Sequence, residues 1–318
     1  MKLTFDQIKA VAVGSLRTEQ GADGIRFFKC TQRQIDAWYS ESETLGQRAE
    51  TTTGVRLDFH TNSRNMSFRA SLGNKFELFI DGVLRRQFKM NETESRTTHF
   101  ALTDPLGGEK ESFRVTLHLP SHEIGALDWI ELDDGATFIP HKFDTKMLFI
   151  GDSITQGWQA QIDTCSYAYR VSHFFNAESV IQGIGGAYFN ENSFDSLPFD
   201  PDTVIVAYGT NDFGHNKTQD EMRAHVRAHL GMIAEEYAKK RIFVISPIWR
   251  GVQVKPMGSF AECRTIVAEE AERLGLAHID GLTLVPPFPE LFPDDLLHPN
   301  ELGFSFYAEN LIAQMQRM

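Results

Sequence analysis

The spacing of hydrophobic and polar residues changes character near residue 140. Before that point, apolar and polar residues alternate over short runs such as 55–60 and 113–119. Alternation with a period of two predicts β-strands that bury one face. The dipeptide Asp81-Gly82 separates two further short runs and is typical of a tight hairpin turn. The first part of the chain is therefore predicted to be an antiparallel β-sandwich.

After residue 145, segments with strand character alternate with segments of helical character. The runs 204–208 and 242–245 are apolar throughout, as expected for parallel strands buried on both faces. The segment between them, 218–240, repeats apolar residues at helical spacing, and 259–274 and 301–318 are similar. This alternation predicts a doubly wound α/β domain with three layers.

Length and composition are consistent with two folded domains. The chain has 318 residues, of which 42% are hydrophobic, enough for two sizeable cores. We place the boundary so that residues 1–142 form an accessory sandwich domain and residues 143–318 form the α/β domain. The formal net charge is −12, without a run of Lys and Arg, which argues against nucleic acid or an anionic membrane as a partner.

The cysteines and the first residues bear on location and cofactors. Cys30, Cys165 and Cys263 are odd in number and widely spaced, unlike a disulfide framework or a set of metal ligands. The first residues lack the apolar core of a signal peptide, and no run is long enough for a transmembrane helix. We therefore expect a cytoplasmic protein with reduced thiols, no metal and no organic cofactor.

A Gly-Asp-Ser turn is the most informative motif of the sequence. Gly151-Asp152-Ser153 directly follows 146–150, a short apolar run that reads as a buried strand. Open α/β sheets place their chemistry at the carboxyl ends of such strands. Ser153 is therefore a candidate nucleophile, whereas Asp152 is expected to bond nearby backbone. Because glycine–serine turns are common, the motif alone would be structural in most cases.

A serine hydroxyl needs a base, and the segment 295–300 contains one. A histidine has a suitable pKa for removing the serine proton, which makes His298 the candidate base. Asp295, three residues earlier, can hydrogen-bond the far ring nitrogen and fix its tautomer. Asp294 is adjacent, but the spacing favours Asp295. The alternative is a loop histidine with a capping aspartate.

Two further turns follow predicted strands and can supply oxyanion donors. Gly209-Thr210-Asn211-Asp212 comes directly after 204–208, and the Asn211 amide can donate to a developing oxyanion. The glycine turn at 183–186 can expose a backbone N–H to substrate. Each turn alone is more often structural, with Asn211 or Asp212 capping backbone groups.

Together these motifs resemble those of the SGNH hydrolases, also called the GDSL esterase and lipase family. The resemblance covers about residues 146–318 and implies a flavodoxin-like α/β/α fold. It assigns the catalytic roles to Ser153 as nucleophile, His298 as base and Asp295 as the orienting acid. The implied oxyanion hole consists of the backbone of Ser153 and Gly186 with the side chain of Asn211.

The amino-terminal sandwich adds a weaker resemblance. Some SGNH enzymes have a similar jelly-roll-like or carbohydrate-binding-module-like domain, among them family two carbohydrate esterases and related acyltransferases. We therefore predict a serine esterase for short-chain acyl esters that deacetylates acylated carbohydrates. The alternatives are an acyltransferase that passes the acyl group to an alcohol, and a non-catalytic glycan-binding protein. A small-molecule or carbohydrate ester is the expected partner, and a homo-oligomer is a further expectation.

Several aromatic and histidine side chains follow the motifs closely. Aromatic rings often pack against sugar rings or acyl groups, so these residues are candidates for a substrate pocket; ordinary packing is the alternative for each. The candidates are Trp158, Tyr188, Phe213, His215 and Trp249.

Overall fold

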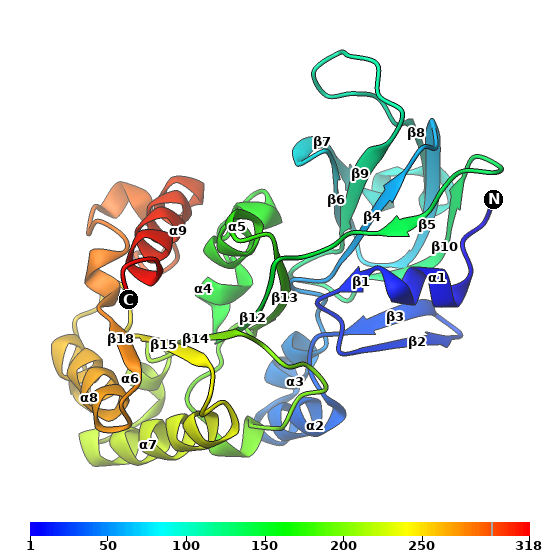
Figure 1. Ribbon diagram of the computed structural model, residues 1–318. Coiled ribbons are helices and arrows are strands. Elements are labelled where there is room, and N and C mark those ends of the chain that lie inside the picture. Colours follow the sequence, from blue (N-terminus) through cyan, green and yellow to red (C-terminus); the bar gives the residue numbers. More distant parts are fainter. Residues whose placement is uncertain (294) are drawn as a thin grey trace. The chain divides into compact units, whose positions relative to one another are not determined.

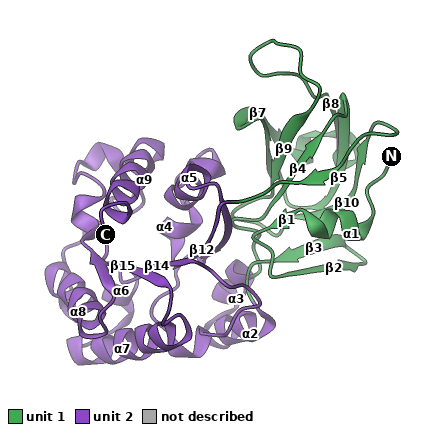
Figure 2. Cartoon of the chain, in the orientation of Figure 1, with its two compact units in different colours: residues 1–30, 50–143 green, residues 31–49, 144–318 purple. Residues whose placement is uncertain are grey.

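The computed structural model describes residues 1–293 and 295–318 and is drawn in Figure 1. Contacts divide the chain into two compact units, coloured in Figure 2: residues 1–30 with 50–143, and residues 31–49 with 144–318. The first unit corresponds to the predicted sandwich and the second to the predicted α/β domain.

The segment 31–49 departs from the predicted boundary, which had assigned it to the sandwich. It forms two helices whose side chains find their partners in the α/β unit. Thr31 donates a hydrogen bond to Asp195 at 2.7 Å. The amides of Gln34 and Gln182 exchange two hydrogen bonds, at 3.2 and 2.9 Å. Assigning this segment to the sandwich was therefore wrong, because its helices pack against a sheet that lies more than a hundred residues later.

The first unit consists of two antiparallel sheets that face one hydrophobic core. One sheet has the order β1-β4-β9-β6-β7, with β11 beside β4, and the other has the order β2-β3-β10-β5-β8. Its elements are α1 (Phe5–Ala10), β1 (Ala12–Val13), β2 (Arg17–Gly21), β3 (Gly24–Phe28), β4 (Arg56–Thr61), β5 (Asn65–Leu72), β6 (Lys75–Ile80), β7 (Val83–Lys89), β8 (Thr97–Ala101), β9 (Phe113–His118), β10 (Ala126–Leu132) and β11 (Ile139–Pro140).

The alternating pattern of the sequence explains this sandwich. Phe59 and Val115 from one sheet and Phe68 and Ile130 from the other are fully buried in the same core, as period-two strands require. The hairpin between β6 and β7 turns at the predicted Asp81-Gly82, where both residues have positive φ, 51° and 79°. Two successive positive φ angles are the requirement of the tight hairpin turn that this dipeptide favours.

The second unit is built on a parallel sheet of five strands with the order β13-β12-β14-β15-β18. Its elements are α2 (Gln32–Glu41), α3 (Glu43–Ala49), β12 (Thr145–Gly151), α4 (Ser153–Gln156), α5 (Tyr167–Phe174), β13 (Ala177–Gly183), β14 (Thr203–Ala207), α6 (Asp212–His215), α7 (Gln219–Glu236), β15 (Arg241–Ile245), β16 (Val254–Lys255), β17 (Gly258–Ser259), α8 (Phe260–Arg273), β18 (Ala277–Ile279) and α9 (Glu301–Met315).

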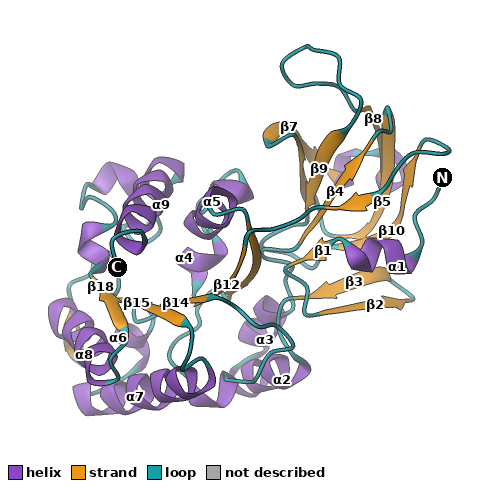
Figure 3. Ribbon diagram, in the orientation of Figure 1, coloured by secondary structure: helices purple, strands orange, loops and turns teal. Residues whose placement is uncertain are grey.

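Helices cover both faces of this sheet, as Figure 3 shows. On the face covered by α5 and α9, Phe149 and Ile205 share a core with Tyr167 and Tyr307, whose rings stack at 4.0 Å. The helices α7 and α8 pack on the other face. This strand order is that of flavodoxin-like folds, so the predicted three-layer α/β class is confirmed. Within the described residues, no helix has the length and apolar character needed to cross a membrane.

The sheet order brings the carboxyl ends of three strands together. β12 lies between β13 and β14, and its last residue, Gly151, pairs with Gly183 on one side and Ala207 on the other. The loops that leave these three strands therefore start at the same edge of the sheet, where doubly wound folds bind their ligands.

Candidate active site

Ser153 begins the short helix α4 immediately after the central strand β12. Asp152 is the N-cap of α4, and its carboxylate accepts a hydrogen bond from the backbone N–H of Ile154 at 2.9 Å. A Cβ on Gly151 would lie 2.1 Å from the Thr155 hydroxyl oxygen, so only glycine fits before the turn. This confirms the structural role predicted for Asp152, and it fixes the backbone from which the Ser153 side chain projects.

The structure brings Ser153, His298 and Asp295 into one hydrogen-bonded series, although Ser153 and His298 lie 145 residues apart. The Ser153 hydroxyl oxygen is 2.7 Å from Nε2 of His298, and Nδ1 of His298 is 2.5 Å from the Asp295 carboxylate. Burial opposes ionisation of Asp295, but hydrogen bonds from the backbone and ring of His298 outweigh it and lower the pKa of this carboxyl. Asp294 lies outside the described residues.

The loop that presents His298 is fixed on both sides. The second carboxylate oxygen of Asp295 accepts the backbone N–H groups of Leu297 and His298, each at 2.9 Å. After the loop, Asn300 caps α9 by accepting a hydrogen bond from the backbone of Gly303 at 3.0 Å. Such support holds the imidazole in one orientation, which proton transfer to and from a serine requires.

The glycine turn after β13 lies against the serine helix. The backbone N–H of Gly185 donates to the side-chain oxygen of Gln156, on α4, at 2.8 Å. Gly186 has a φ of 88°, in the left-handed region that side chains other than glycine rarely adopt. The turn therefore needs glycine at position 186, and a hydrogen bond to α4 sets its position.

The third motif is tied to the second by two hydrogen bonds. The Asn211 amide donates to the Ala187 carbonyl at 2.9 Å, which uses one of its two hydrogens and orients the other. Asp212 accepts the backbone N–H of Phe189 at 3.1 Å. Arg250 donates to the Thr210 carbonyl at 2.7 Å. The predicted oxyanion residues thus belong to one connected set of loops.

Two buried carboxyl groups flank these motifs. Asp152 is 2% exposed and Asp212 is 0% exposed. Burial raises the pKa of each group to about 7. One carboxyl oxygen of Asp212 is buried without a hydrogen-bond partner among the described residues. A carboxyl group in such surroundings favours its neutral form.

The predicted aromatic contacts divide into two groups. Trp158 is half-buried and stacks on the His298 ring, with centroids 5.9 Å apart and planes at 30°. It therefore lies beside the candidate base. Trp249 is half-buried and packs against Phe292 at 5.0 Å, so its contact with substrate stays a prediction.

The aromatic residues after the second and third motifs mainly pack. Tyr188 is 7% exposed and stacks on the exposed His215 at 3.8 Å. Phe213 is fully buried and packs against Phe260 at 5.0 Å. The prediction that Phe213 contacts substrate is wrong, because the first turn of α6 directs its ring into the core.

Two arginines that no sequence motif marks also hold these loops. Arg250 binds the Thr210 carbonyl, as described above, and Arg48 of α3 donates to the Gly185 carbonyl at 2.7 Å. No local signal marks Arg48, because its segment joins the α/β unit only in the tertiary structure.

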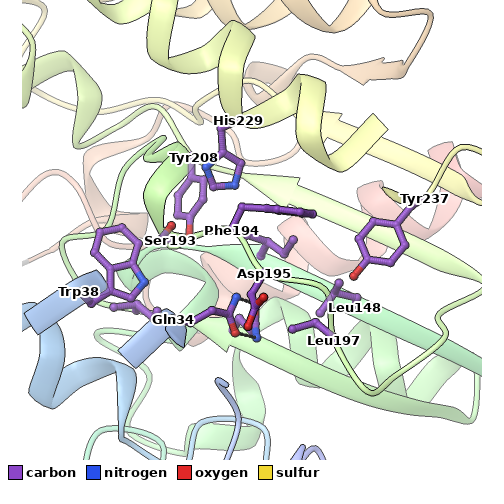
Figure 4. Close-up of a pocket in the computed structure, with 13 residues that line it drawn as sticks. Gln34, Trp38, Leu148, Ser193, Phe194, Asp195, Leu197, Tyr208, His229 and Tyr237 are labelled. Carbon is purple, nitrogen blue, oxygen red and sulfur yellow. Dashed lines mark hydrogen bonds between the residues drawn. The ribbon is translucent and has the colours of Figure 1, made fainter. Parts of the chain in front are cut away.

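A small cavity lies between α2 and the sheet (Figure 4). Its volume is about 10 Å³, and its lining includes Gln34, Trp38, Tyr208 and His229 but none of the predicted site residues. This space is about that of one water molecule, so we interpret it as part of the packing that anchors α2.

Within the described residues, no group of three or more His, Cys, Asp or Glu side chains is arranged to hold a metal ion.

A serine, an imidazole and a carboxylate in series at the carboxyl edge of a doubly wound sheet are features of the α/β serine hydrolases. Residues 149–305 match the model of the GDSL-like Lipase/Acylhydrolase family. This part of the chain therefore carries the domain of that family, as its motifs predicted.

The chain is also similar to a protein of known activity. It is 27% identical over 212 residues to an acetylxylan esterase of Xylanibacter ruminicola; this covers 56% of the chain and 44% of that protein. The matched stretch is thus less than half of the relative.

Solved structures share the fold over most of the chain. The salicylyl-acyltransferase SsfX3 of a tetracycline biosynthetic pathway has a TM-score of 0.80 at 17% identity, over 96% of this chain and 94% of that one. A GDSL-like protein from Bacteroides ovatus has a TM-score of 0.74 at 19% identity, over 100% of this chain and 97% of that one. A family two carbohydrate esterase from Clostridium thermocellum has a TM-score of 0.64 at 18% identity, over 84% and 93%. At these identities the likeness concerns the fold alone.

Proposed function

We propose that this protein is a serine esterase that removes short acyl groups, acetyl above all, from acylated carbohydrates. The single observation that carries the proposal is the series of hydrogen bonds from the Ser153 hydroxyl through His298 to Asp295. The family match and the acetylxylan esterase relative support the reaction and its substrate class.

In the first step, His298 accepts the Ser153 proton while the hydroxyl oxygen forms a bond to the ester carbonyl carbon. Asp295 keeps the imidazole in the tautomer whose Nε2 is unprotonated, and it stabilises the charged ring that forms. The carbonyl oxygen becomes an oxyanion that receives hydrogen bonds from the backbone of Ser153 and Gly186 and from the Asn211 amide. One such donor is typically worth about 10²–10³ in kcat.

The tetrahedral intermediate then expels the alcohol, which takes the proton from His298 and leaves the acyl group on Ser153. In the second step, His298 removes a proton from water as the water oxygen attacks the acyl carbon. Collapse of the second intermediate releases the carboxylic acid and returns the proton to Ser153. No step requires a metal or an organic cofactor.

Substrate profiling tests the proposal directly. The protein is incubated with acetylated xylo-oligosaccharides, other acylated sugars and simple aryl esters, and products are identified by mass. We expect release of acetate, and we expect Ser153→Ala to lower turnover by at least about 10⁴-fold while the fold is kept. Ser305→Ala is the matched control, because that hydroxyl bonds the Glu301 carbonyl within its own helix, α9.

The same measurement separates the alternatives. Transfer of the acyl group to an added alcohol in preference to water would identify an acyltransferase. Glycan binding without any Ser153-dependent turnover would identify a binding protein. Glycan binding by the sandwich and a cytoplasmic location stay predictions from sequence.

A further inference from the structure

The peptide that joins Gly185 to Gly186 is held at several points. Its carbonyl, on Gly185, accepts a hydrogen bond from the Arg48 guanidinium at 2.7 Å. The backbone N–H of Gly185, one peptide earlier, donates to Gln156 at 2.8 Å. A Cβ on Gly186 would lie only 3.1 Å from the Arg48 guanidinium. The side chain of Arg48 therefore lies directly over this turn.

Arg48 is itself positioned by the serine helix region. Its guanidinium lies over the Trp158 ring, 5.2 Å from the centroid, in the geometry of a cation–π contact. Trp158 donates its ring N–H to Gln156 at 3.0 Å and stacks on His298. The arginine thus contacts the same group of side chains that surrounds the candidate nucleophile and base.

The helix pair that carries Arg48 is anchored to the α/β unit at other points. Gln34 bonds Gln182 beside the cavity of Figure 4. Further along α2, Trp38 meets Tyr188 edge to face at 5.7 Å, and Glu41 accepts the Tyr188 hydroxyl at 2.6 Å. These contacts fix α2, and through it α3, so that Arg48 reaches the glycine turn in a defined orientation.

The chemistry of one peptide group turns this contact into a functional inference. In a trans peptide the C=O and the following N–H share a plane and point in opposite directions. A cation that binds the Gly185 carbonyl fixes that plane and hence the direction of the Gly186 N–H. A charge-assisted hydrogen bond to the oxygen also polarises the amide, which strengthens the N–H as a donor.

We propose that Arg48 is a positioning residue that orients and polarises the oxyanion-binding N–H of Gly186. This inference rests on the proposed function, because it assumes that an oxyanion forms beside Gly186. Arg48 acts through the peptide and does not itself touch the reacting atoms. Its contribution appears when negative charge develops on the substrate oxygen, so it raises kcat and leaves substrate binding unchanged.

Steady-state kinetics of the full chain provide the test. Arg48→Met removes the guanidinium and keeps an unbranched apolar side chain. We expect kcat to fall about tenfold with KM unchanged, the signature of an interaction made only in the transition state. Arg33→Met on α2 is the matched control: that side chain is 65% exposed and pairs with Asp195 at 3.5 Å. The control should keep wild-type kcat.

Binding of methylboronic acid gives a readout that a packing role would not move. Its tetrahedral adduct with Ser153 places a negative oxygen where the oxyanion would lie. Arg48→Met should weaken this binding by the same factor as kcat, whereas binding of the sugar product should not change. Equal losses for both ligands, or no loss for either, would overturn the proposal.

Arg48→Lys covers the case in which Arg48→Met does not fold. Lysine keeps a positive charge but lacks the planar fork that binds a carbonyl and lies over a ring at once. We expect the Arg48→Lys variant to fold and to lose part of kcat. If Arg48→Met is unfolded and Arg48→Lys has a wild-type kcat, Arg48 serves folding alone.

If Ser153→Ala keeps its activity, the proposed function fails first. If turnover depends on Ser153 but is insensitive to Arg48, only this inference fails.

Discussion

Asp58 in the sandwich and two carboxyl groups near the candidate site of the α/β unit are buried in opposite ways. In the sandwich, Asp58 is 1% exposed, and Arg114 donates to both of its oxygens at 2.9 and 2.8 Å. Arg56 lies 3.4 Å away. Burial opposes ionisation of Asp58, but hydrogen bonding and the charges of the two arginines outweigh it and lower the pKa.

In the α/β unit, Asp152 and Asp212 are buried equally well, and the described residues place no cation in an ion pair with either one. Their pKa values rise to about 7 because burial penalises the charged form. Buried carboxyl groups are thus stabilised in two ways, by neighbouring cations at Asp58 and by a raised pKa that favours the neutral form at Asp152 and Asp212. The second kind flanks Ser153 and Asn211, consistent with the rule that perturbed pKa values gather at functional sites.

Removal of the cation-paired carboxylate should have the largest effect on stability. Asp58→Ala removes the buried carboxylate that pairs with Arg56, whose side chain is 7% exposed, and with Arg114. We expect a loss of about 3–5 kcal/mol in the free energy of unfolding, as for other broken buried pairs. Chemical denaturation followed by circular dichroism measures it.

The control for Asp58 is a surface pair in the same unit. Asp128 lies 3.1 Å from Arg69, and both side chains are partly in water, at 29% and 49% exposure. Asp128→Ala should cost less than about 1 kcal/mol. Similar losses in the two variants would contradict the distinction between buried and exposed pairs.

The proton-neutralised carboxyls should give stability a pH dependence of the opposite sign. Asp212 keeps its proton in the folded protein up to about pH 7, whereas in the unfolded chain it ionises near pH 4. Its contribution is therefore complete below about pH 4 and is lost as the pH rises toward 7, with a slope of about 1.4 kcal/mol per pH unit. Asp212→Asn should remove the part of the slope that Asp212 contributes, while Asp152 keeps its own.

Denaturation curves at several pH values test that prediction. Asp58 provides the contrast, because its lowered pKa gives stability that is present near neutral pH and is lost as the pH falls below about 4. Asp58→Asn should flatten only the acid side of the profile. A slope between pH 4 and 7 as steep in Asp212→Asn as in the wild type would show that this carboxyl ionises normally in the fold.

A third carboxylate should show a smaller effect. Glu270 on α8 is 1% exposed, but the three arginines that pair with it reach water. Their side chains are 32% (Arg223), 53% (Arg227) and 45% (Arg273) exposed. Hydrogen bonding from Arg227 and then from the other two lowers the pKa of Glu270 to about 2. Glu270→Gln should cost only about 1–2 kcal/mol, because the arginines stay hydrated when the charge is lost.

The same denaturation series checks Glu270. A loss as large as that of Asp58→Ala would mean that burial of the carboxylate alone, and not burial of its partners, sets the cost. The stability from Glu270 should also fall at acid pH, between about pH 4 and pH 2, where the folded carboxylate takes up its proton.

Local sequence patterns predicted much of the fold and most of the candidate site. The runs 204–208 and 242–245 are apolar enough to identify central strands, and they are β14 and β15 in the structure. Ser153 follows a buried strand, and His298 and Asp295 are only three residues apart, so the sheet edge and one loop suffice to place them. Phe213 could not be judged in this way, because position after a motif does not tell whether a ring faces substrate or core.

The sequence by itself determined the two fold classes and the serine, imidazole and carboxylate that meet at the sheet edge, because hydrophobic period and turn motifs act over a few residues. Only the tertiary structure decided that 31–49 joins the α/β unit, that Arg48 binds the Gly185 carbonyl, and that Asp212 is buried with no cation paired to it among the described residues. Each of these depends on a partner, or the absence of one, far away in the chain. Burial and charge pairing are properties of the packed molecule, and the local spacing of hydrophobic residues does not determine them.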